Sequence, residues 1–266
     1  MAITTVDGAL AWMVPSTYYT KALSGTLVAG RPWTPLYAAG YPGPAIAYTG
    51  GATGVNLTFL AGQIPVPAPS GNTHLARFSA VLSAQGGLVV LADRLWHNSI
   101  TVTSTAIQTM ITSAWPARDI NGQTAGAGLL CALECSSLMG AGTPTATLTY
   151  TNSVGTPTRT AQLVIATTTT SPIGTIYPFG LAAGDVGIQS IEAVKLSATM
   201  TTGTAGLILY RPLATLEIPA AGVPNALDVL TSCLPRCYDT TVAFLYYIPT
   251  TTTTTQMHGQ ITFTQG

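Results

Sequence analysis

Charged residues are scarce in this sequence of 266 residues. Nine Lys and Arg residues balance nine Asp and Glu residues, so that 7% of the chain is charged and the formal net charge is zero. An ordinary soluble domain is about 25% charged, and a net charge near zero favours association over dispersal. The scarcity of charge therefore predicts that the chain is part of an assembly in which neighbouring subunits cover much of its surface.

Three classes of protein are disfavoured by what the sequence lacks. No basic stripe is present that could neutralise several phosphates, so we expect no direct contact with nucleic acid. Every apolar run is interrupted within about ten residues, whereas a membrane-spanning helix needs roughly 20 apolar residues. A basic leader with a cleavage site is also missing from the first residues, so we expect no signal peptide. Disorder is disfavoured because 47% of the residues are apolar.

The stretch from about residue 73 to 218 shows a period of two, which is typical of strands with one buried face. In TATLTYT, threonines alternate with Ala146, Leu148 and Tyr150, and similar runs are LVVLADRLW, LLCALECS, AQLVIAT, EAVKLSATM and AGLILYR. Turn-rich segments separate these runs, and no long segment has a helical period. The pattern predicts an all-β protein with an antiparallel β-sandwich or jelly-roll core and few short helices.

The polar faces of these predicted strands consist mostly of threonine. Threonine suits a pleated surface because its branched side chain packs well there. Free sheet edges normally carry Lys or Glu residues that prevent pairing with another chain, and such residues are few here. We therefore expect other subunits to cover many of the edges and faces.

Residues 1–70 differ from residues 71–266, which form the predicted β-sandwich domain. Prolines and glycines interrupt this first region while aromatic residues persist, which fits either an extended arm that docks on another protein or an irregular region folded onto its own domain. If this region is a docking arm, deletion of residues 1–60 would leave a folded domain that no longer binds its particle. Aromatic and Arg side chains carry most of the energy of many interfaces, so the interface candidates are Trp12, Arg31, Trp33, Tyr37 and Tyr41.

Two short helices are expected. The first, VDGALAWM, has Asp7 as its candidate N-cap, and the second, VPNALDVLTSCL, has Asn225. After Pro235 the segments TTVAFLYYIP and MHGQITFT are predicted to be strands around an exposed threonine loop at 250–255.

Candidate catalytic residues are few. Asp93, His97 and Ser99 share one predicted strand face, but side chains two apart on a strand diverge, whereas a triad needs a base that reaches its nucleophile. Asp119 begins a segment that is similar to a calcium loop, but the bidentate acid is missing at the required distance. Asp185 and Glu192 are seven residues apart and would point to opposite faces. We expect no enzymatic activity and no cofactor.

The four cysteines form the pairs Cys131 with Cys135 and Cys233 with Cys237. This spacing falls within the range of zinc sites, and a disulfide between Cys233 and Cys237 is a second alternative. The first pair lies on one face of an apolar strand, where cysteine usually acts as a small buried apolar residue. We therefore expect four free thiols and no metal.

From about residue 60 to the C-terminus the sequence resembles a family of tailed-bacteriophage virion structural proteins. The resemblance lies in short motifs such as RLWHNS, AWPARD and YTNSVGTP. Membership would imply a particle component without catalytic residues, made in the cytoplasm of the host bacterium and located in the virion.

The sequence thus predicts a capsid decoration protein that stabilises the head by packing and strand addition. We expect it to contact itself, with a trimer favoured, and other virion proteins such as the major capsid protein. A tail, collar or fibre component that touches a host glycan through surface aromatics is the alternative. A hydrolase is a third, less favoured class.

Overall fold

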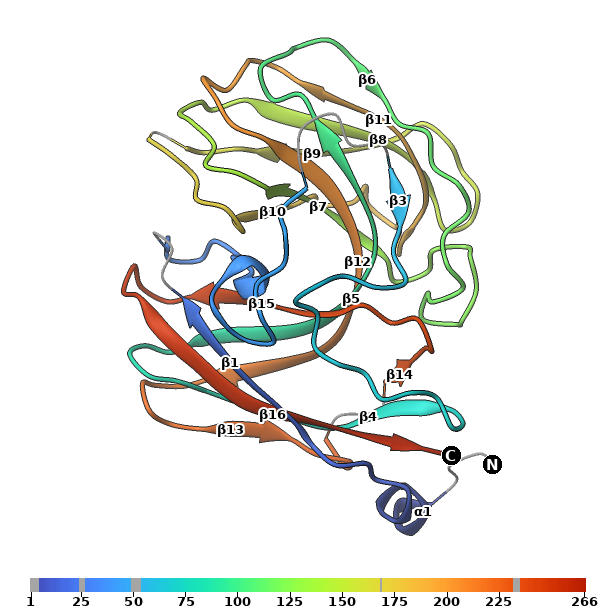
Figure 1. The fold of residues 1–266 in the computed structure, drawn as a ribbon. Coiled ribbons are helices and arrows are strands. Elements are labelled where there is room, and N and C mark those ends of the chain that lie inside the picture. The colour runs from blue at the N-terminus through green and yellow to red at the C-terminus, as the bar shows by residue number, and fades with distance from the viewer. Residues whose placement is uncertain (1–4, 24–26, 49–53, 168, 232–234) are drawn as a thin grey trace. The chain divides into compact units, whose positions relative to one another are not determined.

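The computed structural model describes residues 5–23, 27–48, 54–167, 169–231 and 235–266. The chain divides into two compact units (Figure 1). Unit 1 comprises Met1–Ile46, Thr58–Asp93 and Pro212–Gly266, and unit 2 comprises Ala47–Leu57 and Arg94–Arg211. All strand pairings that define the sheets below are antiparallel, which confirms the predicted all-β class.

The first sheet of unit 1 has the strand order β13-β4-β16-β1-β2, and β14 also pairs with β4 (Figure 1). The strands are β1 (Thr17–Leu23), β2 (Gly40–Tyr41), β4 (Thr73–Leu82), β13 (Asn225–Leu227), β14 (Arg236–Cys237) and β16 (Thr255–Gln265). β16, the last strand of the chain, therefore lies between β1 and β4. The edges of this sheet are occupied by strands of two or three residues from the same chain.

The second sheet of unit 1 is formed by β15 (Ala243–Pro249), the first half of β5 (Gly87–Ile100) and the second half of β12 (Ala205–Ile218). Side chains from both sheets form one core, which includes Phe78, Ile261, Leu91, Leu216 and Tyr247. Two sheets that bury their facing side chains against each other constitute a β-sandwich.

Unit 2 is a second β-sandwich. One of its sheets contains β10 (Ile176–Pro178), β7 (Leu130–Cys135), the remaining halves of β12 and β5, and β3 (Val55–Asn56). The other has the order β6 (Gln108–Thr109), β11 (Ile188–Leu196), β8 (Thr145–Asn152) and β9 (Arg159–Val164). Its core includes Trp96, Leu133, Leu148 and Val194. β5 and β12 thus each contribute residues to both units.

The predicted alternation of buried and exposed residues is confirmed in β8 and β9, whereas LVVLADRLW, LLCALECS and AGLILYR form strands that are buried on both faces. In β8, Ala146, Leu148 and Tyr150 are fully buried, while the threonines between them are half-buried. The strand predicted for EAVKLSATM is confirmed only as far as Leu196, because β11 ends there and Ala198, which was expected on the buried face, is exposed. The strands β15 and β16 flank an exposed threonine segment at 250–254, as the sequence predicts.

The first 70 residues are largely folded onto unit 1. β1 pairs with β16 over its whole length, from Thr17 with Ile261 to Leu23 with Thr255. Tyr19 and Leu23 belong to the core of unit 1, and Trp33 lies in the same core. The described residues of this region therefore pack mainly on unit 1, and the two units divide the chain after Ile46, Leu57, Asp93 and Arg211.

The two expected helices have different outcomes. Helix α1 (Val6–Ala11) is present, but its N-cap is Thr5, whose Oγ1 accepts a hydrogen bond from the Gly8 amide at 3.0 Å, rather than Asp7. The helix expected from Asn225 is wrong. Asn225–Leu227 pairs with residues 78–80 of β4 instead, because tertiary strand pairing outweighs a weak helical preference. A 3-10 helix, η1 (Pro35–Tyr37), was not anticipated.

Deletion of residues 1–60 is predicted to abolish the folding of unit 1 rather than to leave an intact domain. The deletion removes β1 from the centre of a sheet and takes Tyr19, Leu23 and Trp33 from the core. Near-ultraviolet circular dichroism of the truncated protein should show loss of fixed aromatic packing. A shorter deletion of residues 1–11, which ends before β1, should retain it. A native spectrum for the longer deletion would contradict the assignment of β1.

Lys21 is buried on the inner side of β1, at 2% exposure. Its Nζ donates to the carbonyls of Ala38 and Gly43, each at 3.3 Å. Burial lowers the pKa of Lys21 from 10.5 to about 8. The folded protein therefore holds this proton less tightly than the unfolded chain, so this group's contribution to stability rises as the pH increases from about 8 to 10.5.

Lys21→Met is predicted to raise stability at pH 7 by up to about 3 kcal/mol, because it removes the cost of burying an ammonium group. The variant should also lose the rise in stability between pH 8 and 10. Thermal unfolding at pH 7, 8, 9 and 10 measures both effects. Lys195→Met is the matched control, because Lys195 is exposed. Equal pH slopes for the two variants would contradict the role given to Lys21.

Candidate functional site

The interior of the protein holds an unusual share of its charged groups. Seven of the eighteen charged side chains are buried, namely Lys21, Asp93, Arg94, Arg118, Asp119, Glu134 and Arg211. The whole surface therefore carries at most the other eleven charged side chains. Exposed large apolar side chains are present on both units, for example Leu10, Phe59, Ile111 and Val154. The surface is therefore even poorer in charge than the composition indicates.

The outer face of the first sheet of unit 1 is polar but almost uncharged. Tyr18, Thr20 and Ala22 of β1 point away from the core, since the residues between them are buried. Their cross-strand neighbours on β16 are Gln260, His258 and Gln256. The hydroxyl of Thr20 lies 2.8 Å from Nδ1 of His258. The next strand, β4, adds Ser79, Val81 and one charge, Arg77, to this face.

Two tyrosines form an exposed aromatic pair on this face. The rings of Tyr18 and Tyr41 are nearly parallel, at 10°, with centroids 6.1 Å apart, and each residue is 50% exposed. Such separations are typical of offset aromatic pairs. The Tyr18–Tyr41 pair joins β1 to β2, which is hydrogen-bonded to β1 through the register Thr20 with Tyr41.

The position of Tyr41 depends on its two neighbours in the fold. Gly40 has φ of +141°, and a Cβ at this position would lie 2.0 Å from the carbonyl oxygen of Thr20, so glycine is required for β2 to approach β1. The ammonium of Lys21 binds the carbonyls of Ala38 and Gly43, which flank Tyr41 in the sequence. Both features fix the segment that carries the exposed ring.

The interface candidates from the sequence occupy different environments. Trp12 and Tyr41 are exposed at 50% each, and Arg31 and Tyr37 are partly buried. Trp33 is 5% exposed, and its backbone amide donates to the carbonyl of Tyr247 at 2.8 Å. Trp33 is therefore a core residue, the reading that the sequence leaves open. The partner of Tyr41, Tyr18, was missed because single residues give no sign of which strands pair.

Unit 2 presents a threonine face on the sheet β6-β11-β8-β9. Thr149 lies opposite Ala193 on one side and Thr160 on the other, and Thr147 lies opposite Lys195 and Gln162. Ala193 in turn pairs with Thr109. The predicted threonine surface is thus present on this sheet. β9 is its edge strand and carries Val164, which is 63% exposed.

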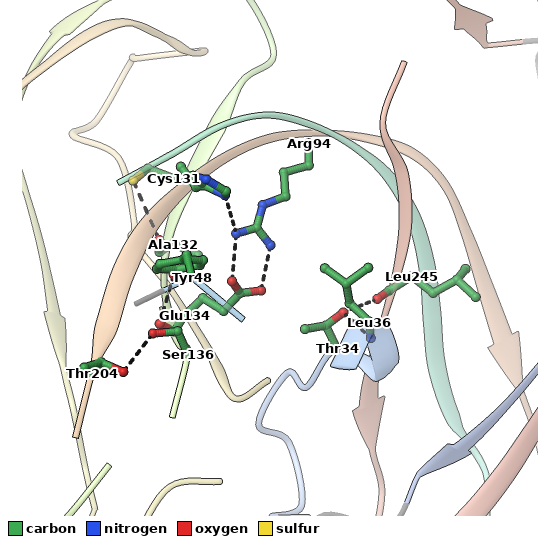
Figure 2. Close-up of polar contacts among 11 residues, drawn as sticks. Thr34, Leu36, Tyr48, Arg94, Cys131, Ala132, Glu134, Ser136, Thr204 and Leu245 are labelled. Atoms are coloured by element: carbon green, nitrogen blue, oxygen red, sulfur yellow. Dashed lines mark hydrogen bonds and ion pairs between the residues drawn. The ribbon is translucent and has the colours of Figure 1, made fainter. Parts of the chain in front are cut away.

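A fully buried ion pair lies on the opposite side of unit 2's first sheet from the core residues Cys131 and Leu133. Arg94 and Glu134 form two parallel hydrogen bonds of 2.9 and 2.8 Å, and both side chains are completely buried (Figure 2). The bidentate geometry satisfies both carboxylate oxygens. The sequence signal for this pair is one acid and one base placed within two otherwise apolar strands.

Aromatic groups enclose this ion pair. The Arg94 guanidinium lies 5.8 Å from the ring centroid of Tyr48 (Figure 2). The rings of Tyr48 and His97 have centroids 4.8 Å apart. Gly206 faces Glu134 across the strands, and a Cβ there would lie 2.5 Å from the Tyr48 ring. Burial, and secondly the Arg94 charge, lower the pKa of His97 to about 4. His97 is therefore neutral at physiological pH.

Asp93 and His97 have separate structural surroundings. The Asp93 carboxylate accepts hydrogen bonds from the Val242 amide at 2.9 Å and the Thr241 hydroxyl at 3.3 Å. Asp93 thus binds a backbone amide and a hydroxyl of the Thr241–Val242 segment, and Trp96 is a core residue at 1% exposure. His97 contacts Tyr48 and Arg94 instead.

The remaining candidate residues serve the local fold. Cys131, Cys135 and Cys237 are buried and Cys131 is a free thiol, whereas Cys233 lies outside the described residues. Within the described ranges no group of three or more His, Cys, Asp or Glu residues is placed to hold a metal ion. The carboxylate of Asp119 accepts hydrogen bonds from the backbone amides of residues 121, 123, 126 and 127, so it holds the local turn together.

Asp185 and Glu192 bind different partners. Asp185 accepts hydrogen bonds from the Tyr150 hydroxyl at 2.6 Å and from Arg159 Nε at 2.9 Å. The bond from Arg159 is the main reason that the pKa of Asp185 falls to about 2. Glu192 accepts from the Thr151 hydroxyl at 2.8 Å. Each acid therefore has its own hydrogen-bonding partners.

Among the helices that the structure describes, none has the length and apolar character required to cross a bilayer. No protein family and no curated protein matches the sequence. The bacteriophage resemblance therefore rests on the short motifs alone.

Fifteen solved chains match in structure. A structure of infectious bursal disease virus strain Gt is 12% identical, and the match covers 95% of this chain and 81% of the other with a TM-score of 0.21. A VP2 subviral particle of the same virus is also 12% identical, and the match covers 96% of this chain and 81% of the other with a TM-score of 0.21. A mutant VP2 in T=1 particles is 12% identical, with 99% of this chain and 80% of the other covered and a TM-score of 0.21. These matches come from viral particles, but at this TM-score they carry no argument about the present chain.

Glu134→Gln is predicted to destabilise unit 2 by about 3–5 kcal/mol, because it leaves the Arg94 charge buried without its counterion. The double variant Arg94→Met, Glu134→Leu should lose much less, because it removes both charges together. Urea unfolding followed through the fluorescence of Trp96 and Trp115, whose rings are 5.6 Å apart, reports on this unit. Glu217→Gln at an exposed site is the control. A loss below about 1 kcal/mol for Glu134→Gln would contradict the argument.

Proposed function

We propose that this chain is a non-enzymatic structural protein of a bacteriophage virion, which decorates the capsid and stabilises the head by packing. It belongs to the virion after synthesis in the bacterial cytoplasm. The proposal is supported by the motif resemblance, and it rests chiefly on one observation, the burial of seven of only eighteen charged side chains. A surface with so little charge lacks the repulsion that keeps free monomers apart.

The threonine face and the β9 edge of unit 2 are the proposed contact surfaces. In unit 1 the edges of the first sheet are taken up by β2, β13 and β14, so strand addition by a neighbour is disfavoured there. In unit 2 the threonine face offers short side chains with few charges. β9 is the outer strand of this sheet apart from one bridge between Gln162 and Gly180, and strand addition by another subunit is proposed along its remaining edge, through main-chain bonds.

The proposed partners are further copies of this chain, as a trimer, and the major capsid protein. Symmetric self-association buries the same surface on each copy. A tail, collar or fibre component is the second candidate, and the exposed Tyr18–Tyr41 pair is the observation that favours it. Immunogold labelling of intact particles separates the two, because label confined to the tail would exclude decoration of the head.

The protein is predicted to form trimers in solution and to cosediment with bare capsids. The double variant Thr149→Lys, Thr160→Lys places two like charges opposite each other on the threonine face and should weaken one or both associations at least about tenfold. Sedimentation velocity and cosedimentation measure these effects. Thr252→Lys in the exposed loop is the matched control. A wild-type protein that stays monomeric at high concentration and leaves capsids unbound would refute the proposal.

A further inference from the structure

We propose that the outer face of the first sheet of unit 1 binds a neutral oligosaccharide along β1, between the Tyr18–Tyr41 pair and a hollow beside Ala22. This inference goes beyond the proposed structural role and does not depend on capsid attachment. Three features of the face support it: an exposed aromatic platform, a row of uncharged hydrogen-bonding groups, and a polar hollow at the other end of the same strand.

The Tyr18–Tyr41 pair supplies the aromatic platform. Its rings lie 10° from parallel, and half of each residue is accessible. Tyrosine combines an apolar ring with a polar hydroxyl, and a pyranose combines an apolar face of C–H groups with hydroxyls at its rim. The accessible half of each residue can therefore contact the C–H groups of a sugar chain while the tyrosine hydroxyls bond its rim.

Uncharged polar groups continue the face beside this platform. Gln260 lies opposite Tyr18 on β16, and His258 lies opposite Thr20, with which it shares a hydrogen bond. Amide, imidazole and hydroxyl groups both donate and accept hydrogen bonds, as sugar hydroxyls do. The hydrogen bond to Thr20 also orients the His258 ring.

A hollow of about 290 Å³ lies at the far end of this row, which follows β1 from Tyr18 through Thr20 to Ala22. Its lining is uncharged and consists of Ala22, Leu23, Ser83, Thr254, Thr255 and Gln256. A strand rises about 3.3 Å per residue, so Tyr18 and Ala22 are about 13 Å apart along β1. This span corresponds to two or three pyranose units.

The charge on this face favours a neutral ligand over an acidic one. Among the outward residues of β1, β4 and β16, the one permanently charged side chain is Arg77, which pairs with Thr262, away from the hollow. Burial of a ligand carboxylate beside uncharged groups would carry a desolvation cost without a counterion. A neutral sugar incurs no such cost.

The platform is held in place before any ligand binds. Gly40 allows β2 to approach the Thr20 carbonyl, and Lys21 binds the carbonyls on both sides of Tyr41. An exposed ring that is fixed in advance loses less conformational freedom on binding. The structure thus supplies a defined, solvent-accessible site rather than two independently mobile tyrosines.

The test uses the full-length protein on an array of immobilised neutral and sialylated oligosaccharides. Calorimetry with maltohexaose, cellohexaose and N-acetylchitohexaose, each at up to about 10 mM, then measures affinity in the range expected for weak ligands. We expect at least one neutral oligosaccharide to bind. The double variant Tyr18→Ala, Tyr41→Ala should bind it at least about tenfold more weakly, and Gln256→Ala should weaken it as well.

Phe59→Ala is the matched control, because Phe59 is an exposed aromatic residue of unit 1 that lies outside this sheet. It should bind the sugar as the wild type does. Thermal melting of every variant checks that it is folded. The proposal is overturned if no neutral oligosaccharide binds, if only sialylated glycans bind, or if the folded double tyrosine variant binds as well as the wild type. None of these results alters the capsid cosedimentation of the wild-type protein.

Discussion

The fold encloses a large share of its few charged side chains in the interior. The Arg94–Glu134 pair is fully enclosed, and Arg118 donates from the same interior to the carbonyls of Leu57 and Arg94. A buried ion pair of this kind adds little net stability compared with an apolar replacement, although breaking it is costly. The pair connects β5 with β7, between which β12 lies, and its enclosure removes two of the eighteen charged side chains from the surface. The proposed role in a particle follows from that surface.

The fold class could be predicted from the sequence, because alternation is a local property. The run TATLTYT predicts β8 with the correct buried face, and AGLILYR predicts the part of β12 that lies in unit 2. Local signals failed where long-range pairing decides the outcome. The segment at Asn225 carries a helix cap signal, but β4 offers it a strand partner more than 140 residues earlier in the chain.

The residues of the candidate surfaces could also be predicted only in part, because local sequence does not show which strands pair. Tyr41 could be selected from the sequence as an aromatic residue in a proline-rich region. Its neighbour Tyr18 could not, because the contact depends on Gly40 and on the pairing of β1 with β2. Trp33 has the same sequence context as Tyr41 but lies in the core. Composition thus identifies residues that are able to make contacts, and topology decides which of them face solvent.

The order of strands along the chain sets the order in which the two sandwiches can be completed. The segments of unit 2 end at Arg211, whereas unit 1 needs β16, at the extreme C-terminus, between β1 and β4. During synthesis the outer face that carries Tyr18 therefore has no central strand until residues 255–265 have left the ribosome. The surface proposed for contacts with other molecules therefore forms only after residues 255–265 have been made, and shorter nascent chains cannot present it.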